Sequence, residues 1–362
     1  MDRLAGVSGF GGVYGTGIVR PQRGSSIVIG YESALAFWRR VRVEDPMWTR
    51  ELLGQLYPDE MLTTLDAEAL AADTSLRPLE LPNLAFERAR HVAAILGLSM
   101  PLTVVVGKRP ARRPSSALVC HTWSGPIADG LLVPVEPGVF MCSPELVVMQ
   151  LAHSLGLYKS IALAMELSGS YSISSNGQCE WDVISLTSVA RLNCLVCVSA
   201  ECRGIRTMRQ VGRLAMDNSA SPRETALAVM LSLPRDLGGW GCGKPRLNAD
   251  ICLSEEAARE CSRSKLIADL LFEDAGLDVE YQGREWHEKS EDRLSDETRQ
   301  NALMMMGKSC LFISKDQLRD EGRMDGIARL IRRKNGLEPF RKELSPKMAS
   351  RRMQMMADLG VL

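Results

Sequence analysis

The chain has 362 residues, of which 45% are hydrophobic and 24% are charged. These are ordinary values for globular proteins, so they exclude wholesale disorder. The length of the chain predicts two or three domains of common size. The 44 basic and 44 acidic side chains cancel, which excludes a globally basic nucleic-acid-binding protein and leaves only local clusters of charge to consider.

Neither the N-terminus nor the apolar runs predict secretion or membrane insertion. The opening MDRLAGVSGFGG lacks the basic stretch and continuous apolar core of a secretory signal. The longest apolar runs, such as ADGLLVPVEPGVFM, are broken well short of the roughly 20 residues that a membrane span needs. Ten cysteines in so long a chain do not indicate a disulfide scaffold. We therefore expect a cytoplasmic protein with free thiols and no membrane partner.

The first half of the chain predicts a Gly-rich, flexible tail over residues 1–26 and an α+β region over residues 27–215. GFGGVYGTG in the tail is no dinucleotide loop, because Tyr14 occupies the third glycine position and no strand precedes it. The α+β region is expected to contain the strand IVIG, the amphipathic helix LAFERARHVAAILGL, the strands PLTVVV, SALVCHTW and GLLVPVEPGVFMCS, and the helix SPELVVMQLAHSL.

Two clusters in this region allow more than one interpretation. The loop after PLTVVV carries four basic residues that either contact a phosphate backbone or are solvated: Lys108, Arg109, Arg112 and Arg113. Cys194 and Cys197 form a CxxC pair, but a structural zinc site needs a second pair at suitable spacing. Their apolar helical surroundings favour cysteines that pack as small core residues.

Residues 216–335 predict an α/β domain, and residues 336–362 a basic, Met-rich tail. The expected order of the domain is a capped helix in SPRETALAVMLSL, a strand in KPRLNADIC, and two strands joined by EDAG. A helix that ends at Gly307, the strand in SCLFISKDQL and the helix MDGIARLIRRK follow.

Three acidic residues of this domain are candidates for a metal site. Glu224 is in the first turn of the leading helix, Asp269 lies inside the apolar strand LIADLLF, and Glu280 ends the next strand. A buried carboxylate is costly without a partner, and a cation shared between carboxylates is one such partner. Mg²⁺ takes oxygen ligands and activates water, as phosphodiester hydrolysis requires. The simpler alternatives are a helix-dipole role for Glu224, a hydrogen-bonded core Asp269 and a solvated Glu280.

Five segments in register carry a resemblance to a known family: SPRETAL, IADLLF, VEYQGREWH, DETRQNALMMMGK and LFISKDQL. In this order they resemble the endonuclease-like domain related to very-short-patch repair endonucleases, a member of the PD-(D/E)XK superfamily, over Ser219 to Lys334. The resemblance implies an α/β fold class with a restriction-endonuclease-like domain, in which helices flank a central mixed sheet.

The same resemblance implies a DNA endonuclease with Mg²⁺ as cofactor. It assigns metal binding to Glu224, Asp269 and Glu280, and further catalytic roles to Gln282 and His287. Relatives usually carry Asp where this chain has Gln282, and the wider superfamily carries Lys. Since Gln can orient a water but supplies no charge, activity is in question at this position. His287 is equally well interpreted as a surface histidine on a loop.

A second resemblance covers Leu84 to Leu157, which is similar to the C-terminal domain of abortive-infection antitoxins. It implies a bacterial protein of phage defence, with DNA and a toxin or another defence protein as partners. Two functions are therefore expected. The first is a Mg²⁺-dependent DNA endonuclease, or nuclease-like protein, of defence or DNA repair. The alternative is a non-catalytic, antitoxin-like DNA-binding transcriptional regulator with a degenerate nuclease fold.

Overall fold

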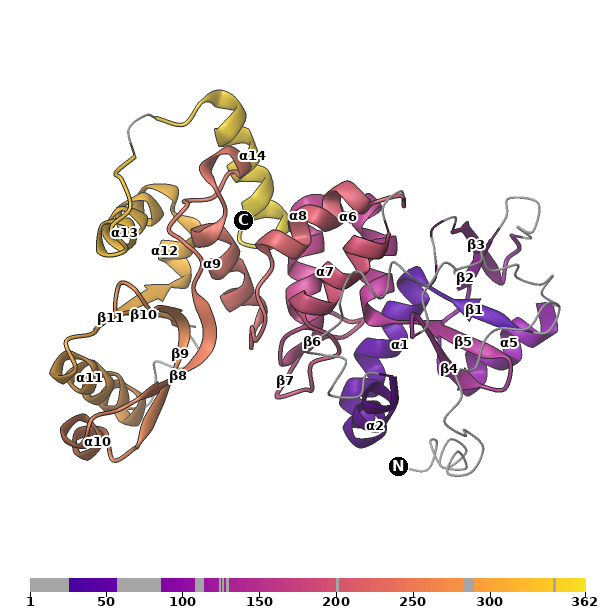
Figure 1. The fold of residues 1–362 in the computed structure, drawn as a ribbon, viewed down its shortest axis with the longest axis horizontal. Coiled ribbons are helices and arrows are strands. Elements are labelled where there is room, and N and C mark those ends of the chain that lie inside the picture. Colours follow the sequence, from indigo (N-terminus) through magenta and orange to yellow (C-terminus); the bar gives the residue numbers. More distant parts are fainter. Residues whose placement is uncertain are drawn as a thin grey trace. The chain divides into compact units, whose positions relative to one another are not determined.

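The computed structural model describes residues 26–56, 86–107, 114–123, 125, 127, 130–199, 202–282, 290–340 and 343–362 (Figure 1). The chain contains both helices and strands, and the two larger sheets are mixed, which confirms the general α/β class expected from the sequence. The chain divides into two compact units. The first comprises residues 1–34 and 73–143, and the second comprises residues 35–72 and 144–362.

The first unit is built on a five-stranded sheet in the order β3-β2-β1-β5-β4. Its elements are β1 (Ile27–Ile29), α5 (Phe86–Ile95), β2 (Leu102–Val106), β3 (Leu118–Thr122), β4 (Leu132–Glu136) and β5 (Val139–Cys142). Strand β1 runs parallel to β5 and antiparallel to β2. Every residue of β1, β2 and β5 is buried, as expected for short apolar runs at the centre of a sheet.

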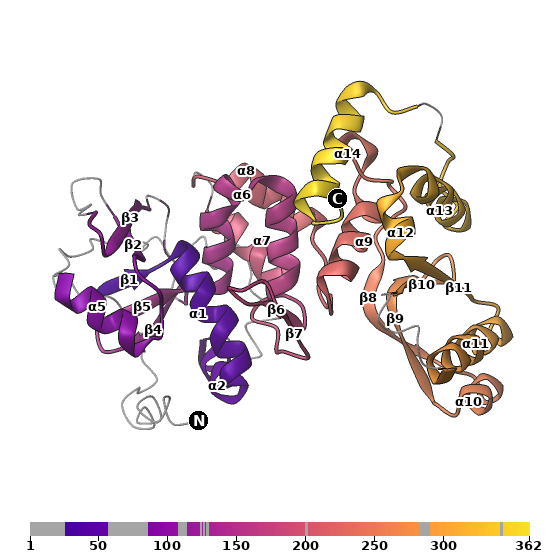
Figure 2. The same ribbon diagram turned by 180° about the vertical axis from the view of Figure 1, so that it is seen from behind.

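The second unit begins with helices that pack around α6. These elements are α1 (Tyr31–Glu44, in this unit from Leu35), α2 (Pro46–Leu56), α6 (Pro144–Leu167), the hairpin β6 (Tyr171–Ile173) and β7 (Cys179–Trp181), α7 (Val189–Val198) and α8 (Ile205–Leu214). Helices α7 and α8 pack against α6 (Figure 2). The buried guanidinium of Arg42 donates to the carbonyls of Glu166 and Gly169, at 3.2 and 2.8 Å. It thereby binds α1 to the C-terminal end of α6, where cations are favoured.

Helix α6 is the one helix of the described residues that is long and apolar enough to cross a membrane. Most of the tested stretch is buried inside the protein, as in the core helix of a folded domain. Gly156 interrupts it with φ 75° and ψ −176°, a conformation that only glycine adopts readily. The two halves of α6 are therefore shorter than the roughly 20 residues of a span.

The next part of the second unit is built on a four-stranded sheet in the order β11-β10-β9-β8. The elements are α9 (Pro222–Ser232), a short turn η2 (Arg235–Leu237), β8 (Arg246–Cys252), α10 (Glu255–Cys261), β9 (Lys265–Phe272), β10 (Leu277–Gln282), α11 (Ser290–Met305) and β11 (Ser309–Ser314). Neighbouring strands are antiparallel from β8 to β10, and β11 is parallel to β10. Helix α11 supplies the crossover that a parallel pair requires.

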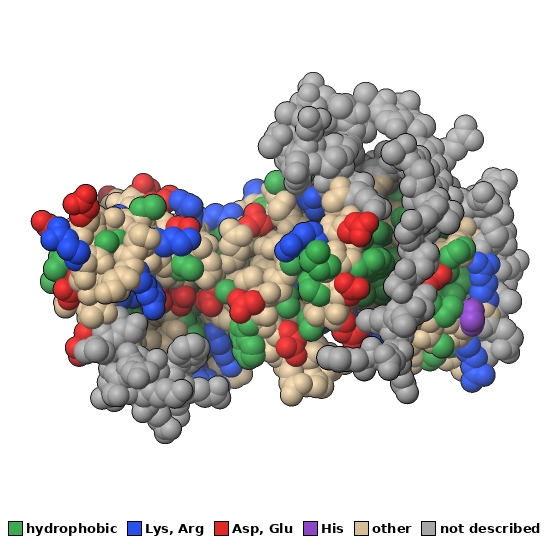
Figure 3. All heavy atoms as spheres, turned by 90° about the horizontal axis from the view of Figure 1, so that it is seen from below, with side chains coloured by type: hydrophobic (Ala, Val, Ile, Leu, Met, Phe, Trp, Pro, Cys, Tyr) green, Lys and Arg blue, Asp and Glu red, His purple; other side chains and the backbone are tan. Residues whose placement is uncertain are grey.

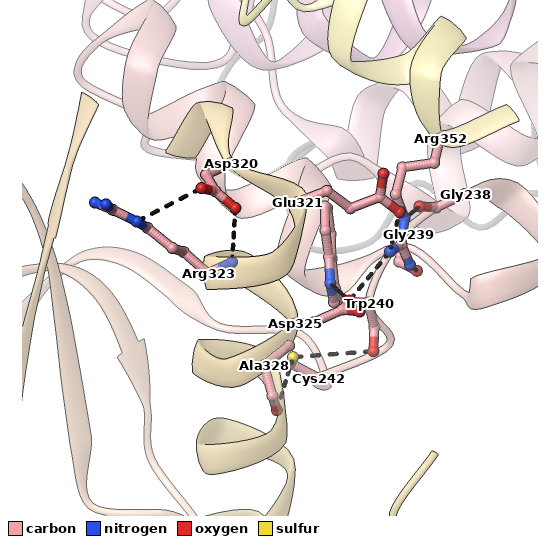
Figure 4. A network of polar contacts seen from close by, with 10 residues as sticks. All are labelled: Gly238, Gly239, Trp240, Cys242, Asp320, Glu321, Arg323, Asp325, Ala328 and Arg352. Atoms are coloured by element: carbon pink, nitrogen blue, oxygen red, sulfur yellow. Dashed lines mark hydrogen bonds and ion pairs between the residues drawn. The ribbon is translucent and has the colours of Figure 1, made fainter. Parts of the chain in front are cut away.

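Three further helices complete the chain: α12 (Lys315–Arg319), α13 (Glu321–Lys334) and α14 (Pro346–Asp358). Arg352 attaches α14 to the segment after α9 (Figure 4). Its buried guanidinium donates to the carbonyls of Gly238 and Gly239, at 2.9 and 3.2 Å, and lies 3.9 Å from the centre of the Trp240 ring. Asp325 of α13 accepts hydrogen bonds from Arg352 and from the indole of Trp240. One side chain thus connects three elements of the unit.

The expected domain limits differ from the observed units. The division falls at residues 34/35 and 143/144 rather than at 215/216, because α6, α7 and α8 belong to the same compact unit as the second sheet. The segment 336–362, expected as a tail, contains α14 with buried Arg352, Met355 and Met356. The Gly-rich tail expected over residues 1–26 lies outside the described residues except for Ser26.

Candidate carboxylate site

Asp269 and Glu280 meet where the backbone pairing of β9 and β10 ends. The last paired residues are Leu270 and Val279, and the next step along this register sets Asp269 opposite Glu280. There the carboxylates accept backbone hydrogen bonds across the strands. The N–H of Tyr281 donates to Asp269 Oδ2 at 2.9 Å, and the N–H of Asp269 donates to Glu280 Oε1 at 3.3 Å. Both carboxylates are thereby fixed on one face of the sheet.

Glu224 approaches this pair from the first turn of α9. Ser221 caps the helix, since its hydroxyl accepts from the N–H of Glu224 at 3.1 Å. The carboxylate of Glu224 then turns back and accepts from the N–H of Ala220 and from the amide of Asn248, at 3.0 and 2.8 Å. Glu224 is 9% exposed. Glu224 therefore lies at the N-terminus of α9, where the helix dipole favours a negative charge, as the simpler interpretation expects. Its charge also raises the pKa of Asp269.

Asp278, Arg299 and Cys310 extend the cluster toward α11. The guanidinium of Arg299 donates to Asp278 Oδ2, at 3.0 Å from Nε and 2.7 Å from Nη2, and its Nη2 also pairs with Glu280. Cys310 of β11 lies next to Asp278, and burial raises the pKa of its thiol. Asp278 is 1% exposed, and its second oxygen, Oδ1, has no hydrogen-bond partner among the described residues. A buried carboxylate with an unsatisfied oxygen is costly.

The cluster carries more negative than positive charge. Three buried or half-buried carboxylates, those of Asp269, Asp278 and Glu280, surround the one guanidinium of Arg299. Burial, and then the charge of Glu224, raises the pKa of Asp269. Burial, and then the charges of Asp269 and Asp278, raises the pKa of Glu280 in spite of Arg299. Such a site gains free energy by taking up a proton or a cation.

The donor set fits a hard divalent cation through two of the three predicted ligands. Asp269 and Glu280 supply carboxylate oxygens side by side, and Mg²⁺ commonly takes one or two carboxylates together with waters. No group of three or more His, Cys, Asp or Glu side chains that could hold a metal ion is present in the part of the chain that the structure describes. Glu224 therefore lies near the pair without completing a three-carboxylate site.

Of the other predicted site residues, only Gln282 lies among the described residues. Gln282 ends β10, is paired with Ser314 of β11 and lies on the same face as Glu280, two residues earlier. His287 lies outside the described residues. So do all four basic residues of the predicted phosphate-contacting loop: Lys108, Arg109, Arg112 and Arg113.

Sequence reasoning missed three residues of the cluster. Asp278 precedes Glu280 by two positions, and the period of a strand places both on one face. Arg299 lies in DETRQNALMMMGK, a segment singled out for its resemblance and not for its charge. Asn248, which holds Glu224, has φ 46° inside β8. Only the first of these positions has a signal in the sequence, since the partners of Arg299 and Asn248 are distant along the chain.

Comparison with known proteins gives no relative for this site. No protein-family model, no curated protein and no solved structure matches the chain.

Proposed function

We propose that the second unit is a Mg²⁺-dependent DNA endonuclease that hydrolyses phosphodiester bonds at the site of Asp269 and Glu280. The observation that carries the proposal is the pair of half-buried carboxylates at the end of the β9–β10 pairing, with its surplus of negative charge. The order of the elements supports it as well. Asp269 lies on the second strand after α9 and Glu280 on the third, as a restriction-endonuclease-like domain of the resembled family requires.

In this proposal the chain's own residues hold and orient the reactants. Asp269 and Glu280 would hold the cation, and the charge of Glu224 beside Asp269 would favour its binding. A bound Mg²⁺ supplies an activated water and stabilises charge on the phosphate. Gln282 orients the attacking water by a hydrogen bond, because its amide carries no charge. Arg299 holds Glu280 against Asp278, and His287 is the proposed general acid or base.

We extend the proposal to a cytoplasmic bacterial protein of phage defence or DNA repair. Its basis is the resemblance of the two segments to endonuclease-like and antitoxin domains. No disulfide joins the ten cysteines, all of which lie among the described residues, and this supports a reducing compartment. The region that resembles the antitoxin domain would bind DNA, through its loop of four basic residues, or a partner such as a toxin.

A plasmid-nicking assay tests the endonuclease. Wild type with Mg²⁺ or Mn²⁺ is expected to convert supercoiled DNA to nicked circles, and EDTA to abolish this conversion. Asp269→Asn, which keeps the size and the hydrogen-bond acceptor, is expected to nick at least about 100-fold more slowly. The matched control is Asp250→Asn, because Asp250 is an exposed acid of β8 paired with Lys265. Equal activity of wild type and Asp269→Asn would contradict the proposal.

One observation favours the second candidate function, a non-catalytic DNA-binding regulator of the antitoxin type. Arg299 already neutralises part of the cluster through Asp278 and Glu280, and Gln282 adds no cation to it. A degenerate nuclease fold with this internal ion pair would bind DNA without cutting it. DNA affinity without nicking, on supercoiled, linear and single-stranded DNA with either metal, would favour this candidate.

A further inference from the structure

Helix α8 presents a row of arginines and contains no acidic residue. Its sequence, IRTMRQVGRL, packs its apolar side against α6 and α7. Arg206, Arg209 and Arg213 are exposed on the other side, and residues three and four apart share one face of a helix. Arg203, just before the helix, is exposed as well. Four guanidinium groups therefore occur within eleven residues of the second unit.

The four arginines have no acidic partner among the described residues, in contrast to two exposed arginines elsewhere in the second unit. Arg246 pairs with Glu273 at 2.5 Å and Arg323 with Asp320 at 3.5 Å. By contrast, none of the four arginines of the row forms an ion pair with a described residue; the one hydrogen bond among them is from Arg213 Nε to the carbonyl of Arg209. Adjacent, unneutralised cations repel each other, and a polyanion relieves this repulsion.

The chemistry of the row favours phosphate groups over an acidic protein. Arginine forms two parallel hydrogen bonds with phosphate and with carboxylate groups alike, so the surroundings of the row distinguish the two partners. Protein interfaces, in contrast, have apolar and aromatic residues at their centre, and none of the exposed large hydrophobic residues belongs to α8. On the face of the molecule drawn in Figure 3, acidic and basic side chains are interspersed.

The C-terminal end of the row is connected to the carboxylate site through strand β8. The ammonium of Lys244 donates to the carbonyl of Arg213 at 3.1 Å. Lys244 is itself exposed and leads into β8, where Asn248 donates to Glu224 at 2.8 Å. Both features belong to the second unit. The row and the acidic site are thus linked through hydrogen bonds of one segment of the second unit.

We propose that Arg203, Arg206, Arg209 and Arg213 bind the phosphate backbone of duplex DNA. The choice of DNA as the polyanion rests on the proposed function, whereas the binding itself requires neither the metal nor the cut. Contacts to phosphates carry no sequence information, so the row binds duplexes of any sequence and its affinity falls steeply with salt.

Fluorescence anisotropy of a labelled 20-base-pair duplex, in EDTA, tests the row. The triple variant Arg206→Gln, Arg209→Gln, Arg213→Gln is expected to bind about tenfold or more weakly than wild type. The slope of log K against log salt is expected to fall by about 2 to 3, since each lost phosphate contact removes roughly 0.9. Circular dichroism checks that α8 stays folded, and Gln keeps a high helix propensity.

The matched control removes the same charge elsewhere. Arg259→Gln, Arg263→Gln, Arg329→Gln also lowers the net charge by three, at exposed arginines of α10, of the turn after it and of α13. It is expected to keep wild-type affinity and slope. Equal losses in the two triple variants would mean that only overall charge matters, and would overturn the proposal. So would undetectable binding of wild type at low salt.

A competition experiment and the absence of metal separate DNA binding by the row from binding of an acidic protein and from DNA cleavage. Poly-glutamate at equal charge concentration is expected to displace the labelled duplex poorly. If it displaces the duplex fully from wild type, and binds the triple variant of the row more weakly, the row binds an acidic protein. That result would overturn the assignment to DNA. Because the assay contains EDTA, a failure of the nicking experiment leaves the binding result intact, and a failure here leaves the nicking result intact.

Discussion

At the scale of single residues, the site depends on carboxylates that take the place of backbone hydrogen-bond partners. Asp269 and Glu280 each accept an N–H from the neighbouring strand, so their orientation is fixed by the sheet itself. The same contacts keep both groups half-buried beside Asp278 and Glu224. An unliganded site of this kind favours protonated carboxylates, and this has a measurable effect on stability.

The pH dependence of unfolding tests that effect. The pKa of Asp269 is raised to about 7, while an unfolded Asp titrates near 3.9. Between about pH 4 and pH 7 the folded chain therefore binds more protons, and the free energy of unfolding falls as pH rises. Asp269→Asn removes the titrating carboxylate and with it this fall in the free energy of unfolding. We expect it to be more stable than wild type at pH 8, on the order of 1–3 kcal/mol, with a smaller difference at pH 5.

Urea unfolding without metal, at pH 5 and pH 8, measures this difference. Asp250→Asn serves as the control because Asp250 is exposed and paired with Lys265, and it is expected to show no such trend. A lower stability of Asp269→Asn at pH 8 would contradict the account of the site. Greater stability also ensures that slow nicking by this variant is not a failure to fold.

The sequence predicts the individual acids of the site better than their arrangement. An Asp in an apolar strand and a Glu at the end of the next one are visible as exceptions to hydrophobic patterning, and the structure places them opposite each other. The partners of Glu224 and Glu280 come from β8 and α11. Nothing local in the sequence identifies Asn248 or Arg299, since their roles arise only when distant elements pack.

At the scale of elements, the strands of the two larger sheets and several helices follow from local patterns, whereas one helix forms where the sequence predicts a tail. The apolar strands, the Ser221 cap and the helix that ends before Gly307 form as expected. The exception is α14, whose sequence, PKMASRRMQMMAD, mixes basic and polar residues with methionines and is typical of a solvated tail. Its stability comes from tertiary contacts, above all those of Arg352, which a sequence pattern does not reveal.

Arg352→Ala tests the attachment of α14. The change removes hydrogen bonds to Gly238 and Gly239, the stacking on Trp240 and the charge opposite Asp325. We expect a loss of about 2–3 kcal/mol in the free energy of unfolding, below the usual cost for a buried pair because the acids are partly exposed. Lys347→Ala, on the exposed first turn of α14, is the control and is expected to change stability by less than about 0.5 kcal/mol. Equal effects of the two changes would contradict the role of Arg352.

At the scale of the whole molecule, a net charge of zero conceals two local concentrations of opposite sign. The second unit has an acidic cluster in its sheet and the arginine row on α8. Composition predicts neither, because it averages over the chain. The limits of the units were also beyond the sequence, since the long apolar helix α6 follows the first sheet directly in sequence but packs in the second unit.

The central claim is that Asp269 and Glu280 bind a divalent cation. Electron paramagnetic resonance counts free Mn²⁺ during a titration and tests this claim without any DNA or turnover. We predict about one Mn²⁺ per chain at pH 8, weaker binding at pH 5, where protons compete with the metal, and loss of the site in Asp269→Asn. Mg²⁺ is predicted to displace the bound Mn²⁺. The same Mn²⁺ binding in wild type and Asp269→Asn, or none in wild type, would contradict the account.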